Sequence, residues 1–169
     1  MTEIGTITDA DEIYYYFEMI NSVTPQSVLD AGMFLKRIGA ISRQAMSCEI
    51  PQSVRLYGID FFPETKMAVY RNIYDEIVTK RQFFGQERLP WEQSFFDVAV
   101  MLETENCLDE QENRELWSYV LQNAKSIMAD TAAAKNQVER GRIKGYYPVS
   151  VGTKSYAWIP LQELGRVGE

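Results

Sequence analysis

The strongest constraint on the fold is a run of mainly apolar residues at positions 95–102, Phe-Phe-Asp-Val-Ala-Val-Met-Leu. Such a run is typical of a strand that is covered on both faces in the centre of a parallel sheet. Shorter runs at residues 27–32, 54–60 and 126–129 have a similar character. We predict that these four segments are strands of one sheet, with residues 81–85 as a further short strand.

Segments with apolar residues at helical spacing lie between these strands. The predicted helices cover residues 9–21, 35–48, 64–80, 110–123 and 131–140. Asp109 and Asp130 precede the last two and are predicted N-cap residues. In the helix at 110–123, the spacing predicts that Leu116, Trp117 and Val120 face inward. Strands that alternate with helices predict parallel βαβ units with right-handed crossovers.

The C-terminal part has a different pattern. Residues 146–151 and 155–159 form two short runs joined through Gly152 and Thr153, which predicts an antiparallel hairpin. Pro148 favours a place at the sheet edge, because proline cannot donate a ladder hydrogen bond.

These patterns predict an α/β fold: a Rossmann-like, mostly parallel sheet with helices on both faces and a C-terminal antiparallel hairpin. The sequence has no internal repeat and no linker rich in Pro, Gly or Ser. We therefore expect residues 1–169 to form a single domain, with an N-terminal helix at about 9–21 and a core at about 27–160. Ligands of such sheets bind at the carboxyl ends of the strands, where the strand order reverses.

The composition excludes several classes of site. With 17 basic and 24 acidic residues, the net charge is −7, so we expect no nucleic-acid partner. The absence of histidine rules out Ser-His-Asp and Cys-His nucleophile systems. Two isolated cysteines, Cys48 and Cys107, make neither a disulfide framework nor a zinc site, and we expect no metal.

The location is also predicted from composition. No apolar run reaches the roughly 20 residues of a membrane span, so we expect no membrane association. The acidic, polar N-terminus is unlike a signal or transit peptide. These features predict a cytoplasmic protein.

Three segments share an order and spacing with a known family. They are Val-Leu-Asp-Ala-Gly at 28–32, Leu-Tyr-Gly-Ile-Asp at 56–60, and the stretch from Gln86 through Leu89-Pro90-Trp91 and Ser94-Phe95-Phe96-Asp97 to Val100. Together they resemble the class I S-adenosylmethionine-dependent methyltransferases. The resemblance covers about 27–160.

The resemblance implies S-adenosylmethionine as the cofactor. The cofactor-binding residues that it implies are Asp30, Ala31, Gly32, Phe34, Asp60, Phe61, Gln86 and Glu87. A strand-end carboxylate such as Asp60 can accept hydrogen bonds from the two ribose hydroxyls. The alternatives are that Asp60 is a helix cap or turn residue, and that Gly32 is an ordinary turn glycine.

The sequence also departs from the family pattern. Phe34 and Lys36 replace the second and third glycines of the first motif, and Gln86 replaces an acid after the third strand. Residues 101–104 replace the Asn/Asp-Pro-Pro-aromatic motif of nucleic-acid amino methyltransferases, which disfavours base methylation. Glu103 or Glu105 is a candidate general base or a partner for a cationic substrate; the alternative is a solvated loop acid.

The sequence is compatible with two main functions. The first is a methyltransferase that acts on a small molecule. The second is a catalytically inactive, methyltransferase-like binding or scaffold protein that has lost the cofactor because of Phe34 and Lys36. A different ligand of the same crevice, such as a nucleotide, is a third reading. Because the chain has no evident insertion for a substrate lid, a second copy in a homodimer or a partner protein is expected to complete the site.

Overall fold

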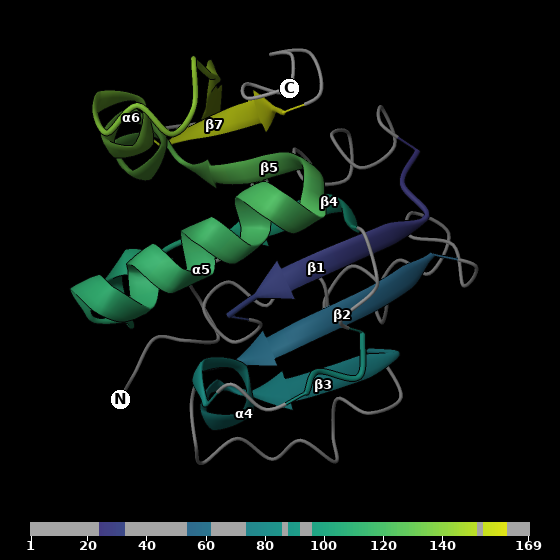
Figure 1. The fold of residues 1–169 in the computed structure, drawn as a ribbon. Helices are drawn as coiled ribbons and strands as arrows, with labels where there is room; N and C mark the ends of the chain where they lie inside the picture. Colours follow the sequence, from purple (N-terminus) through teal and green to yellow (C-terminus); the bar gives the residue numbers. More distant parts are fainter. Residues whose placement is uncertain are drawn as a thin grey trace, which may run out of the picture.

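The computed structural model describes residues 24–32, 54–61, 74–85, 88–91, 96–151 and 154–161. Their strands are β1 (Ser27–Ala31), β2 (Arg55–Asp60), β3 (Glu76–Thr79), β4 (Phe96–Met101), β5 (Ala124–Asp130), β6 (Tyr147–Val151) and β7 (Lys154–Pro160). They form one sheet in the order β3-β2-β1-β4-β5-β7-β6 (Figure 1). The pairs from β3 to β5 are parallel, whereas β7 pairs antiparallel with β5 and β6. The predicted mostly parallel sheet with a C-terminal antiparallel hairpin is confirmed.

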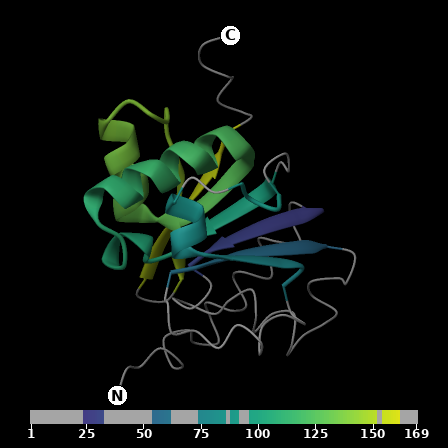
Figure 2. The same ribbon diagram turned by 60° about the horizontal axis from the view of Figure 1, so that its bottom comes forward.

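The described helices are α4 (Lys80–Phe84), the 3₁₀ helix η2 (Thr104–Asn106), α5 (Glu110–Asn123) and α6 (Thr131–Glu139). Figure 2 shows α5 lying along one face of the sheet. Its inner residues Leu116, Trp117 and Val120 are at most 1% exposed, as their spacing predicts. They share one apolar cluster with Ala133 and Ala134 of α6, so both helices cover the same face. The helices predicted for residues 9–21 and 35–48 lie outside the described residues.

The start of α5 follows from its local sequence. The Asp109 carboxylate accepts from the Glu112 backbone N–H at 2.8 Å, and the Glu112 carboxylate accepts from the Asp109 N–H at 3.0 Å. This capping box satisfies two N–H groups that a helix start leaves without partners. The predicted N-cap at Asp109 is confirmed.

The third strand differs from the prediction. Within the described residues, the predicted helix at 64–80 is wrong for 76–79, which form β3, and the predicted strand at 81–85 is wrong because α4 occupies it. Thr79 and Gln82 exchange side-chain and backbone hydrogen bonds in a capping box, which starts a helix at Lys80. Before that cap, residues 76–79 pair in register with β2, and this pairing overrides the helical spacing.

Asp130 also has a different role from the predicted one. It stands at the N-cap position of α6 but makes no capping hydrogen bond with its side chain. Instead, its carboxylate accepts from the backbone N–H of Glu103 at 2.5 Å. This contact ties the loop after β4 to the end of β5.

β6 and β7 form the predicted hairpin, with Pro148 on the edge strand β6. None of the helices in the described ranges has both the length and the apolar character to cross a bilayer. The single-domain organisation of residues 1–169 stays a prediction.

Candidate functional site

The strand order reverses between β1 and β4, so the crevice expected for a ligand lies at the carboxyl ends of these strands. β1 ends at Ala31, which is in register with Ile59 of β2. Gly32 follows with φ +76°, a conformation that glycine adopts without strain. Its backbone N–H donates to the Ile59 carbonyl at 2.9 Å. The turn after β1 therefore lies beside Asp60, as the sequence predicts.

The two carboxylates of this region are buried on one face of the sheet. Asp30 is in register with Gly58, and Asp60 lies two residues further along β2, so alternation places both on the same face. Asp30 is 5% exposed and Asp60 is 2% exposed. Charged groups at this depth need polar partners, and both residues have them within the protein.

One partner of Asp30 comes from beyond the neighbouring strand. The hydroxyl of Tyr74 donates to Asp30 Oδ2 at 2.5 Å. Tyr74 precedes β3, so its ring reaches across β2, where the in-register residue Gly58 has no side chain to obstruct it. Tyr74 thereby holds Asp30 next to the β1 turn, a role that its predicted place in a helix did not suggest.

A cavity of about 630 Å³ opens at the ends of β2 and β3. Its lining residues are Phe61, Thr79, Lys80, Arg81, Phe84, Gly85 and Glu112. The rings of Phe61 and Phe84 are 6.4 Å apart with 30° between their planes, and they form an apolar wall. Phe61 directly follows Asp60 in the chain, but within the described residues neither Asp60 nor the turn after β1 lines this cavity.

Aromatic contacts hold α4 against α5. Phe83 makes edge-to-face contacts with Phe84 at 4.9 Å and with Tyr119 of α5 at 5.0 Å. The Tyr119 hydroxyl accepts from Trp91 Nε1 at 2.9 Å, and burial raises the pKa of Tyr119 although this hydrogen bond lowers it. Such contacts give α4 a defined place despite its short length.

An ion pair adds a second connection between the two helices. Lys80 Nζ lies 3.2 Å from Glu112 Oε2, and both side chains line the cavity. The other oxygen of Glu112 accepts in the capping box of α5. Because the Glu112 carboxylate makes both contacts, it links Lys80 of the cavity lining to the N-terminal end of α5.

The loop after β4 contains the two candidate acids. Glu103 is half-buried and has φ +60°, which is uncommon for a residue with a side chain. Its backbone N–H is held by Asp130, and such backbone conformations persist where the surroundings enforce them. Glu105 is exposed and lies two residues away, along η2.

Cys107 is a further titratable group, and it directly follows η2. Burial and, less strongly, the negative charge of Glu103 raise the pKa of the Cys107 thiol, while Lys80 lowers it. The thiol therefore lies within the electrostatic influence of both the candidate base and the cavity lysine.

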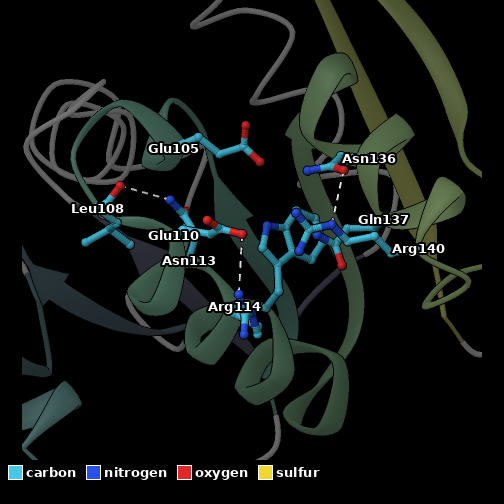
Figure 3. A pocket seen from close by; sticks show the side chains of 9 residues that line it. Glu105, Leu108, Glu110, Asn113, Arg114, Asn136, Gln137 and Arg140 are labelled. Atoms are coloured by element: carbon cyan, nitrogen blue, oxygen red, sulfur yellow. Dashed lines mark hydrogen bonds and ion pairs between the residues drawn. The ribbon is translucent and has the colours of Figure 1, made fainter.

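The predicted site residues thus separate into groups. Asp30, Ala31, Gly32, Asp60 and Phe61 gather at the carboxyl ends of β1 and β2. Glu103 follows β4, the neighbour of β1, whereas Glu105 lines a different cavity (Figure 3). Phe34, Gln86 and Glu87 lie outside the described residues, and the binding roles of the whole set stay predictions.

The site predicted from the sequence did not include Tyr74, Lys80, Arg81 or Phe84. The β-branched residues Ile77, Val78 and Thr79, followed by Gln82 at capping-box spacing, were the available signal for the last three. Tyr74 has no comparable local signal, because its partner is 44 residues away.

Comparisons with known proteins support the fold. No protein-family model and no curated protein sequence matches the chain. The chain is similar in structure to Thermoplasma acidophilum 1320, with a TM-score of 0.59 and 13% identity over 91% of this chain and 90% of the other. It is also similar to a candidate O-methyltransferase from Klebsiella pneumoniae, with a TM-score of 0.55 and 11% identity over 91% and 82% of the two chains.

A third similar structure is an RNA methyltransferase from Salinibacter ruber in complex with S-adenosyl-L-homocysteine. Its TM-score is 0.56, with 12% identity over 91% of this chain and 92% of the other. The chain has the class I S-adenosylmethionine-dependent methyltransferase fold, in a divergent form. Because identity is low, these likenesses define the fold, whereas function depends on the site.

Proposed function

We propose that this chain binds S-adenosylmethionine at the carboxyl ends of β1 and β2 and transfers the methyl group to a small molecule. The main support is the hydrogen bond from the Gly32 N–H to the Ile59 carbonyl, which sets the turn beside the buried Asp60 carboxylate. The cavity lined by Phe61, the residue after Asp60, has a volume of about 630 Å³, within the range of small-molecule sites, about 300–1,000 Å³.

The described residues fit the nucleoside end of this cofactor. Asp60 can accept hydrogen bonds from the two ribose hydroxyls. Phe61 and Phe84 offer an apolar wall on which a flat heterocycle can pack. Gly32 has no side chain that would keep the cofactor from the backbone of the turn.

The chemistry places modest demands on the protein. When bound, the cofactor supplies an electrophilic methyl group on a sulfonium. The residues of the chain then align an acceptor and remove its proton. We assign proton removal from a hydroxyl acceptor to the Glu103 carboxylate, because this residue follows β4 next to β1. The net charge of −7 favours a small acceptor over RNA.

A second candidate function is supported by the sequence of the loop after Gly32. Phe34 and Lys36 stand where the family has glycines, and a ring at residue 34 can fill the space of the cofactor. The chain would then be a binding or scaffold protein with the same fold.

Ligand titration separates the two candidates. We expect S-adenosylmethionine or S-adenosylhomocysteine to raise the melting temperature, since a ligand at 100 times its Kd stabilises a protein by about 2.7 kcal/mol. Asp60→Asn removes the charge from the proposed ribose contacts, which contribute about 1.5–3 kcal/mol each, so the Kd should rise by about 10- to 100-fold. Glu139→Gln, an exposed charge change on α6, is the matched control and should leave the Kd unchanged.

Absence of any shift at millimolar concentrations of both ligands would exclude the methyltransferase proposal. If Phe34→Gly then created binding, the lost-cofactor function would be supported. Equal affinities of Asp60→Asn and the unmodified chain would remove Asp60 from the site.

A further inference from the structure

Another cavity lies on the α5 and α6 side of the sheet. It has a volume of about 260 Å³, and it shares no lining residue with the cavity beside Phe61. Figure 3 shows the α5 residues on one side, and Asn136 and Gln137 of α6 with Arg140, the residue after α6, facing them from the other. Its position makes it separate from the proposed cofactor site.

Three buried polar atoms of the lining residues have no hydrogen-bond partner within the described part of the chain. They are Asn113 Oδ1, Trp117 Nε1 and Gln137 Oε1. Trp117 is 1% exposed and Gln137 is 3% exposed, so bulk water does not compensate them. Because an unpartnered polar group in a protein interior is unfavourable, three around one cavity point to a bound molecule that satisfies them.

The chemical character of two atoms is fixed. Asn113 Nδ2 donates to the carbonyls of Leu108 at 3.1 Å and Asp109 at 3.2 Å, which leaves Oδ1 as an acceptor directed elsewhere. Trp117 Nε1 can only donate. With Gln137 Oε1, the cavity therefore offers two acceptors and one donor.

The charges around the cavity are balanced. Arg114 pairs with Glu110 at 3.4 Å, and Arg140 Nε donates to Asn136 Oδ1 at 3.3 Å. Glu105 adds a further negative charge. Since the arginines have partners and acids accompany them, the lining favours a neutral ligand over an anion.

We propose that the α5–α6 cavity binds a small neutral molecule through a primary carboxamide group. Two N–H bonds of a carboxamide match the oxygens of Asn113 and Gln137, and its carbonyl oxygen matches the indole N–H of Trp117. The volume is slightly below the usual range of about 300–1,000 Å³ for ligand pockets, which sets a small size for the molecule.

The test compares nicotinamide with nicotinate, which has a carboxylate in place of the carboxamide. The chain has three tryptophans, and Trp117→Phe identifies the indole N–H signal of Trp117 in a ¹H–¹⁵N spectrum. We expect nicotinamide at millimolar concentrations to shift this signal in a saturable way, and nicotinate to bind at least about tenfold more weakly.

The variant Gln137→Met removes one acceptor and should weaken nicotinamide binding about tenfold. Gln122→Met, on the exposed side of α5, is the matched control and should bind like the unmodified chain. Equal binding of the two compounds, or unchanged binding by folded Gln137→Met, would overturn the proposal. A cavity that holds only water would give no saturable shift with either compound, which would overturn it as well.

Discussion

Tyr74→Phe tests the arrangement that holds the turn after β1. The substitution removes one oxygen atom and leaves the ring in place. Tyr74 is 3% exposed and Asp30 is 5% exposed, and the hydroxyl lies 2.5 Å from Asp30 Oδ2. Because both groups are buried, water cannot readily replace the lost donor.

The expected loss follows from the charge of the acceptor. A hydrogen bond to a charged group contributes about 1.5–3 kcal/mol to the free energy of unfolding. For a chain of this size, each 1 kcal/mol changes the melting temperature by about 2–4 °C. Tyr74→Phe should therefore lower the melting temperature by about 3–12 °C.

The measurement is urea and thermal unfolding followed by circular dichroism. Tyr147→Phe is the control, because Tyr147 is 59% exposed, and it should change the free energy of unfolding by less than about 0.5 kcal/mol. Combining Tyr74→Phe with Asp30→Asn should give a coupling of about 1 kcal/mol. A Tyr74→Phe variant as stable as the control, with no coupling to Asp30, would refute the contact across β2.

Two further predictions concern the turn and the thiol. Gly32→Ala forces a side chain into φ +76° and should destabilise the chain by about 1–2 kcal/mol in the same unfolding assay. Gly145→Ala is the control, because open space surrounds Gly145, and it should be nearly neutral. Equal stabilities of the two variants would contradict the assigned turn. Glu103→Gln removes a charge that raises the pKa of Cys107. In a Cys48→Ser background, this variant should therefore react with iodoacetamide at half of its maximal rate at a lower pH. Lys80→Met removes a charge that lowers the same pKa, so it should move that pH upward. An unchanged half-maximal pH in the Glu103→Gln variant would show that the two groups do not interact.

The elements that the sequence predicts well have strong local signals. The apolar run of β4 is unlike any amphipathic helix, and α5 combines helical spacing with a capping box at Asp109. β1 and β2 end in Asp30-Ala31-Gly32 and Asp60, which place the turn and the carboxylate at neighbouring strand ends once the strands are parallel.

The third strand shows where local signals are ambiguous. Tyr74 and Ile77 lie at helical spacing, yet residues 76–79 form β3 because they pair with β2, which lies earlier in the chain. This pairing could not be predicted from local sequence, because it depends on the position of β2 in the folded sheet.

The sites also depend partly on local sequence and partly on long-range contacts. The sequence by itself determined the strands β1, β2, β4 and β5, the helix α5 and the acidic residue at the end of β2, because these depend on residue type and short-range spacing. Only the tertiary structure decided that Tyr74 reaches Asp30, that Phe61 meets Phe84 beside a cavity, and that Asn113 and Gln137 face one space. These contacts join residues that are far apart in the sequence, so they form only when the strands and helices pack against one another.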